Sequence, residues 1–150
     1  MVSVKGSSGK LVDVQMLGIG EVVRMLRSKG QDITRGADLG VVKAGAYIVD
    51  EVKESIIGNR AEHKSVDTGT FANSIEFKKT GEAQGIVKSN PQTYPGTSTS
   101  TADVAKFLEK DRQHFANTRE RTRNEVKEII KKEIKKNIWF IEQKINEVII

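Results

Sequence analysis

Cysteine is absent from this 150-residue sequence. The absence excludes a disulfide framework, a thiolate nucleophile and any zinc or iron–sulfur site that uses cysteine ligands. Aromatic residues are scarce as well, at 5% with one tryptophan, so a core has to be built mainly of Val, Ile, Leu and Ala. With 37% hydrophobic residues, the composition still lies well above the disordered range.

Long apolar runs are also missing. No run approaches the roughly 20 apolar residues that a membrane span requires, and residues 1–9 contain no apolar stretch of signal-peptide length. We therefore expect a soluble chain made inside the cell, with no membrane partner. Its length favours a single domain over 1–150, with a flexible segment at 1–9. The 25 basic and 20 acidic residues give a mildly basic net charge of +5.

Apolar periodicity predicts three elements in the first part of the chain: a strand over 10–16, a short helix over 21–29 and a long amphipathic helix over 34–57. In the long helix, apolar residues recur at spacings of three and four and fall on one half of the helical projection, the half that normally faces a core. These residues are Leu39, Val42, Ala46, Val49, Val52 and Ile56.

A hairpin is predicted in the middle of the chain, with a half-buried strand over 71–79, a turn over 80–82 and a returning strand over 84–88. Both prolines and six Ser or Thr residues follow within 90–101. This composition predicts an irregular Ser/Thr-rich loop, long enough to indicate either disorder or a partner that orders it. One or two helical turns are expected around 104–108.

The last third of the chain carries the strongest helical pattern, from about 117 onward, with Asn117 or Thr118 as the N-cap. About 30 residues of helix would be roughly 45 Å long, which is more than a globule of this size can cover. Part of the helix should therefore project or lie against another subunit. Its apolar stripe comprises Val126, Ile130, Ile134, Ile138, Ile141, Ile145 and Val148.

The end of this helix is apolar nearly all round, because Trp139, Phe140 and Ile150 add to the stripe. Such a helix end is buried, and a chain of this size offers little in which to bury it. We therefore predict a subunit interface anchored by Trp139 rather than an internal core position.

Lysines recur along the same helix at i, i+4 spacing, Lys131 with Lys135 and Lys132 with Lys136. Nearby glutamates partly neutralise them, and a solvated helix face explains the pattern most simply. Phosphate contact by these four lysines is the alternative, which makes a basic nucleic-acid-binding accessory protein the second hypothesis.

The triplet Asp67-Thr68-Gly69 matches the active-site signature of aspartic proteases, which need two such carboxylates and hence a dimer of so short a chain. Its polar flank and the helical character of the chain argue against a protease, and an Asx turn is the structural interpretation. The two histidines, His63 and His114, lie at no recognised ligand spacing and are expected at the surface. Nothing assembles a nucleophile, a base and an oxyanion hole, so we expect no enzyme, cofactor or metal.

Residues 66–75 read VDTGTFANSI, after a strand, glycines and a first helix over 14–26 and before the stretches 87–90 and 104–109. This order resembles the siphophage family of tail-completion and head–tail joining proteins, whose signature is V-D-T-G-x-L-x-x-S-I. The chain departs from the family pattern at Asp103-Val104, where an aromatic-Ala pair is usual, and at Lys110-Asp111, where Gly-Thr is usual.

The resemblance covers about residues 10–137 and implies an α+β fold, a small antiparallel sheet flanked by a long amphipathic helix and a long C-terminal helix. It implies a virion structural protein without catalysis, assembled in the host cytoplasm, that joins or caps the tail at the head–tail junction as a ring, commonly of six copies. Its partners would be further copies of itself and other head–tail connector or tail-tube proteins. In this interpretation loop 90–101 and the helices form ring contacts, and the structural signature residues are Asp67, Thr68, Gly69, Ser74 and Ile75.

Overall fold

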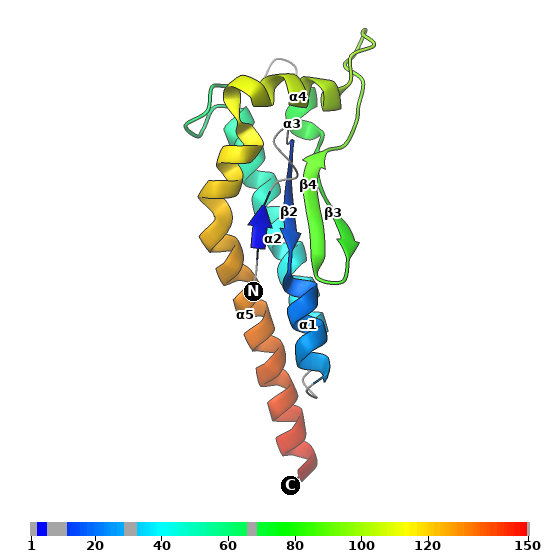
Figure 1. The fold of residues 1–150 in the computed structure, drawn as a ribbon, viewed down its shortest axis with the longest axis vertical. Helices are drawn as coiled ribbons and strands as arrows, with labels where there is room; N and C mark the ends of the chain where they lie inside the picture. The colour runs from blue at the N-terminus through cyan, green and yellow to red at the C-terminus, as the bar shows by residue number, and fades with distance from the viewer. Residues whose placement is uncertain (1–2, 6–11, 29–32, 66–68, 150) are drawn as a thin grey trace.

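A computed structural model describes residues 3–5, 12–28, 33–65 and 69–149, with side chains over 12–28, 33–65 and 69–136. Four strands and five helices follow one another along these ranges (Figure 1). They are β1 (Ser3–Lys5), β2 (Asp13–Leu17), α1 (Ile19–Ser28), α2 (Thr34–Ile56), α3 (Thr70–Asn73), β3 (Ile75–Gly81), β4 (Gln84–Ser89), α4 (Thr101–Arg112) and α5 (His114–Ile149).

The fold is α+β, as the sequence predicts. The strands form one antiparallel sheet in the order β1-β2-β4-β3. The two long helices cover one face of this sheet, α2 against β3 and β4 and α5 against β1 and β2 (Figure 1). Alternation along the strands turns Val14, Met16 and Val87 into the core beneath the helices. Within the segment 1–9, where the sequence predicts flexibility, Ser3–Lys5 pair with β2.

Small residues decide which side of α2 is buried. A Cβ atom at Gly40 would lie 2.9 Å from Ile130 Cα of α5, and one at Gly45 would lie 2.3 Å from Cδ1 of Phe77 on β3. These glycines let α5 and the sheet approach the α2 backbone closely, and such close packing sets the orientation of the helix. The buried side of α2 comprises Gly36, Ala37, Gly40, Val41, Ala44, Gly45, Ile48, Val52, Ser55 and Ile56.

The predicted bounds of this helix are confirmed, but its predicted apolar half is only partly the buried one. Val52 and Ile56 are buried. Leu39 and Val42 are 45% and 42% exposed, and Ala46 is exposed too. The prediction is wrong for these three residues because helical periodicity cannot distinguish a stripe of large apolar residues from a stripe of glycine and alanine that a neighbour fills.

The central hairpin forms as predicted, with Phe77 opposite Val87. The predicted strand over 71–79 is wrong at its start, because 70–73 form α3 and the strand begins at Ile75. In loop 90–101, Thr93 and Ser100 form an isolated β-bridge, and the Ser100 hydroxyl accepts a hydrogen bond from the Ala102 amide at 3.2 Å as the N-cap of α4. The loop is thus ordered by its own hydrogen bonds.

Helix α5 begins at His114, earlier than predicted, and the expected caps at Asn117 and Thr118 are wrong. The chain turns from α4 into α5 through Gln113, which has a positive φ of 52°. The carboxylate of Glu109 then accepts the Phe115 amide at 3.0 Å and the Ala116 amide at 2.8 Å. A carboxylate in this position satisfies two of the free amides of the first turn and favours the positive end of the helix dipole.

The 36-residue length of α5 carries it past the rest of the molecule. Val126 and Ile130 are buried against α2 and the sheet, as the stripe predicts, and Ile134 is partly buried. The two helices run in opposite directions, and the C-terminal end of α5 extends beyond the other helices and the sheet (Figure 1). The expectation of a projecting helix is therefore confirmed.

Candidate interaction surfaces

The described residues of the sequence signature, 69–75, lie at the junction of α3 and the sheet. Asp67 and Thr68 lie outside the described residues. Gly69 precedes α3 with a φ of +84°, a conformation that favours glycine. The Ser74 hydroxyl donates to the Phe71 carbonyl at 2.6 Å and lies 2.7 Å from the Ser89 hydroxyl, joining α3 to β4.

Ile75 is 4% exposed and belongs to the core. The next link in the same junction is the Asn90 amide, which donates to the Ser74 carbonyl at 2.7 Å. Within the described part of the signature, these contacts tie adjacent elements together and present no group to a ligand.

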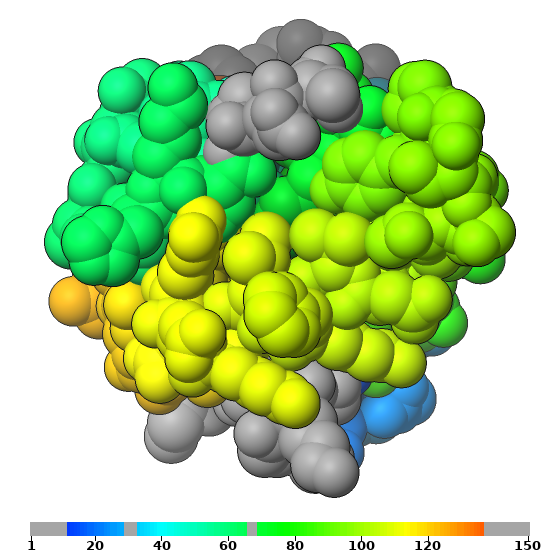
Figure 2. All heavy atoms as spheres, turned by 90° about the horizontal axis from the view of Figure 1, so that it is seen from above, coloured from blue at the N-terminus to red at the C-terminus, as the bar shows by residue number. Residues whose placement is uncertain are grey.

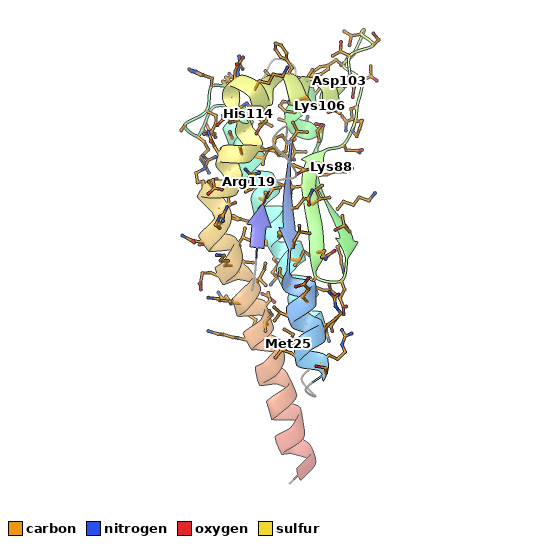
Figure 3. All side chains as sticks on the ribbon, in the orientation of Figure 1. Met25, Lys88, Asp103, Lys106, His114 and Arg119 are labelled. Atoms are coloured by element: carbon orange, nitrogen blue, oxygen red, sulfur yellow. The ribbon has the colours of Figure 1, made fainter. Side chains whose placement is uncertain are left out.

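A buried polar cluster lies at the corner where α4 meets α5 (Figure 3). At its centre, His114 is 1% exposed, with Nδ1 2.7 Å from Ser55 Oγ and Nε2 2.6 Å from Ser65 Oγ. The expected surface position is confirmed for His63 and wrong for His114. Local spacing gave no sign of this, because Ser55 and Ser65 lie 59 and 49 residues away along the chain.

The carboxylate of Glu62 sets the direction of the hydrogen bonds in this cluster. The Ser55 hydroxyl donates to Glu62 Oε1 at 2.5 Å, so Ser55 Oγ accepts from His114 Nδ1 and the free lone pair of Nε2 accepts from the Ser65 hydroxyl. Glu62 itself is 7% exposed and also accepts from Arg121 at 3.0 Å. These hydrogen bonds, chiefly that from Arg121, outweigh burial and lower the Glu62 pKa.

The His114 imidazole is held neutral. Burial, opposed by the Glu62 carboxylate and assisted by the nearby Arg112 guanidinium, lowers the pKa of His114 to about 4. Arg112 donates to the Ser65 hydroxyl at 2.8 Å and to the Lys64 carbonyl at 2.5 Å. The cluster therefore fastens the 59–65 connection to α2 and to the α4–α5 corner.

A hydroxyl bonded to an imidazole also raises the question of a nucleophile. The geometry does not favour one. Ser65 uses its backbone N–H to bond the Ile56 carbonyl at 2.7 Å, so this amide is not available to stabilise an oxyanion. An imidazole with a pKa near 4 is also a weak general base at neutral pH. The arrangement is that of a hydrogen-bond cluster that stabilises the fold.

Apolar side chains are exposed on three helices. Met25 on α1 is 50% exposed, and Phe107 on α4 is 68% exposed. Met25 lies on α1, towards the other end of the body from α4 (Figure 3). Seen from above, segment 90–112 covers much of the α4 end beside the 57–65 connection (Figure 2). Met25 and Phe107 are each the one strongly exposed large apolar residue that is described on its helix, and single exposed apolar residues are common on protein surfaces.

The third exposed apolar surface is continuous. We call it the outer face of α2, and it consists of Leu39, Val42 and Ala46, with Ile57 just past the end of the helix. Val49, beside this face, is partly buried and packs against the core. The residues of the outer face occupy successive turns on the side of α2 opposite Val41 and Ile48. Helix α2 is thus apolar on two opposite sides, only one of which is covered by the described part of the chain.

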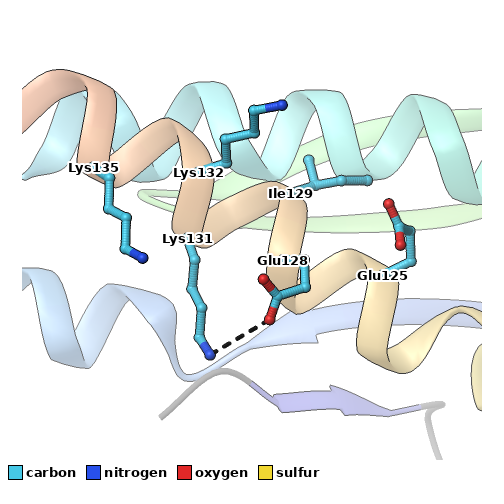
Figure 4. A pocket seen from close by; sticks show the side chains of 6 residues that line it. All are labelled: Glu125, Glu128, Ile129, Lys131, Lys132 and Lys135. Atoms are coloured by element: carbon cyan, nitrogen blue, oxygen red, sulfur yellow. Dashed lines mark ion pairs between the residues drawn. The ribbon is translucent and has the colours of Figure 1, made fainter.

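Some of the lysines of α5 form ion pairs with carboxylates. Lys131 lies 3.7 Å from Glu128, and Lys136 lies 3.3 Å from Glu133, a buried carboxylate that Lys43 of α2 also contacts at 2.7 Å. Three of the four predicted lysines, all but Lys136, line an open pocket of about 400 Å³ together with Glu125, Glu128 and Ile129 (Figure 4). The pocket carries charges of both signs.

Trp139, Phe140 and Ile150, the predicted interface residues, lie outside the described side chains. Among the side chains that are described, no group of three or more His, Cys, Asp or Glu residues could hold a metal ion. No helix in the described ranges is long and apolar enough to cross a membrane. Comparison with protein family models, curated proteins and solved structures found no match to this chain.

Proposed function

We propose that this protein is a virion structural component that joins or caps a phage tail at the head–tail junction and works as a ring-forming oligomer without catalysis. The observation that carries the proposal is the outer face of α2. A helix that is apolar on opposite sides is normally covered on both, and an exposed apolar strip such as Leu39, Val42 and Ala46, two turns long, is typical of a protein–protein interface.

The projecting end of α5 supports the same proposal. Eight of the 14 residues in 137–150 are apolar by sequence. Two different unpartnered surfaces on one chain favour head-to-tail association, and such contacts close into a ring when the rotation between neighbours permits. The signature resemblance over 66–75 supplies the location in the virion.

Light scattering on the purified protein, together with negative-stain microscopy, tests the assembly. We expect a closed ring, or a monomer that forms the ring when it meets the portal or tail-tube proteins of its virion. Pull-downs with those proteins test the second case. A chain that stays monomeric at all concentrations and binds none of them would contradict the proposal.

Nucleic-acid binding is the second candidate, favoured by the gathering of Lys131, Lys132 and Lys135 at one pocket. Contacts to several phosphates would make duplex binding weaken steeply with salt. The test is a titration of fluorescent duplex at about 50 and 200 mM salt, with Lys132→Ala and Lys135→Ala together as the variant and Lys110→Ala, on α4, as the control. Absence of binding at the lower salt concentration would remove this candidate.

A further inference from the structure

From the two unpartnered surfaces we infer a specific subunit contact: the projecting segment 137–149 of α5 from one copy packs on the outer face of α2 of the next copy. The inference rests on the proposed ring and adds which surfaces make it. The partner of the outer face of α2 is therefore a second copy of this chain.

The segment cannot cover the outer face of its own α2. Gly40 of α2 meets Ile130 of α5, and the helices run antiparallel, so each residue further along α5 lies nearer the start of α2. Helix α2 begins at Thr34, six residues before Gly40, and both helices rise by the same distance per residue. The start of α2 therefore lies opposite the position six residues after Ile130, which is residue 136. The backbone from 137 onward therefore lies past the end of α2, and Figure 1 shows the end of α5 extending past α1 as well.

The two surfaces match in length. Segment 137–149 spans about 20 Å as an α-helix, and the stretch of α2 from Arg35 to Val49 spans about the same. A helix-on-helix contact of this length can bury several apolar side chains on each partner. On the α2 side these are Leu39, Val42 and Ala46, which lie at the centre of this stretch.

The charges are complementary. Arg35, Lys43 and Lys53 lie on or beside the outer face of α2, with Asp50 as its exposed acidic residue; Lys43 is paired with Glu133 of its own subunit. Segment 137–149 contains Glu142 and Glu147, with Lys144 as its basic member. A net basic surface meeting a net acidic segment favours this heterologous pairing over pairing of either surface with itself, where like charges would meet.

The absence of native cysteine allows a direct test in the full-length chain. Val42→Cys and Ile145→Cys are made in separate preparations, mixed, and treated with a flexible bismaleimide cross-linker. We expect the mixed 42–145 product to dominate over 42–42 and 145–145 products. Met25→Cys replaces Val42→Cys in the control, because Met25 is 50% exposed, slightly more than Val42 at 42%, but lies on α1; the 25–145 product should be several-fold less abundant.

A second measurement uses the single tryptophan, Trp139, which lies within the docking segment. Dilution of the oligomer should shift its emission to longer wavelength as the segment is released. Val42→Glu should raise the midpoint concentration of this transition about tenfold or more, because a charge would be placed in the centre of the contact. Met25→Glu should change it less than about threefold, and circular dichroism checks that both variants are folded.

The outcomes separate this inference from the proposed function. Dominant 42–42 or 145–145 products, or an oligomer unaffected by Val42→Glu, overturn the α2–α5 contact and leave the ring proposal standing. A wild-type chain that neither associates nor binds the neighbouring virion proteins overturns both. Dominant 42–145 product together with the loss of association in Val42→Glu supports the contact.

Discussion

Acid should destabilise this protein through His114, the buried member of its two histidines. The folded-state pKa is lowered to about 4 from the ordinary value of 6.5. As the pH falls, the unfolded chain therefore binds a proton first, and the free energy of unfolding falls between about pH 6.5 and pH 4. A difference of about 2.5 pKa units corresponds to a loss of about 3 kcal/mol across that range.

The assay is urea denaturation at pH 7 and pH 4.5 on the wild type, His114→Gln and His63→Gln. Other groups titrate in this range, among them Glu51 and Glu62, whose pKa values are lowered chiefly by hydrogen bonds from Arg60 and Arg121. The comparison between variants isolates the histidine. We expect His114→Gln to be less stable than the wild type at pH 7 and to lose about 2 kcal/mol less on acidification.

The control His63→Gln replaces an exposed imidazole and should leave stability at pH 7 within about 0.5 kcal/mol of the wild type. Equal acid losses in the wild type and His114→Gln would refute the reasoning, because they would mean that the imidazole is not kept neutral by the fold. NMR titration of the His114 ring gives an independent check, with a midpoint expected near 4.

Three further substitutions test the packing and the caps, each by chemical denaturation at pH 7. Gly40→Ala should cost about 1–3 kcal/mol, because the new Cβ meets the backbone of Ile130, and a neutral result would mean that α5 packs less closely. Glu109→Ala should cost about 1–2 kcal/mol by leaving two amides of α5 uncapped, with Glu109→Gln recovering part of it. Ser74→Ala should cost about 1–2 kcal/mol, because it leaves the buried Ser89 hydroxyl without this partner; the double variant with Ser89→Ala should cost less than the sum of the two single changes.

The proposed subunit contact changes the meaning of the periodicity in α2. The apolar spacing predicts one buried half, yet the fold buries the glycine and alanine side and leaves Leu39 and Val42 exposed. If the outer face is covered by a neighbouring copy, the large apolar residues are buried in the assembly rather than in the subunit. The spacing of large apolar residues in α2 would then indicate packing between subunits rather than packing within one subunit.

The polar cluster around His114 could not be predicted from the sequence, and the reason differs from that for α2. Its hydrogen bonds join Ser55, Glu62 and Ser65 to His114, groups that the chain brings together only when α2 and α5 are packed. No spacing rule links positions so far apart. The capping of α5 by Glu109 was not predicted either. The apolar periodicity indicated that the helix starts near residue 117, whereas Gln113 makes a tight turn between α4 and α5 and places the start at His114.

The sequence by itself determined the bounds of α2, the central hairpin and the projection of a helix too long for its globule, because these follow from local periodicity, turn residues and helical rise; the resemblance over residues 10–137 implied the α+β class. Only the tertiary structure decided which side of α2 is buried, where α5 starts and that His114 is enclosed. The buried side of α2 depends on how closely α5 and the sheet can approach its backbone, which glycine at positions 40 and 45 permits. The start of α5 depends on the turn at Gln113 and the Glu109 cap, and the enclosure of His114 depends on residues far away along the chain.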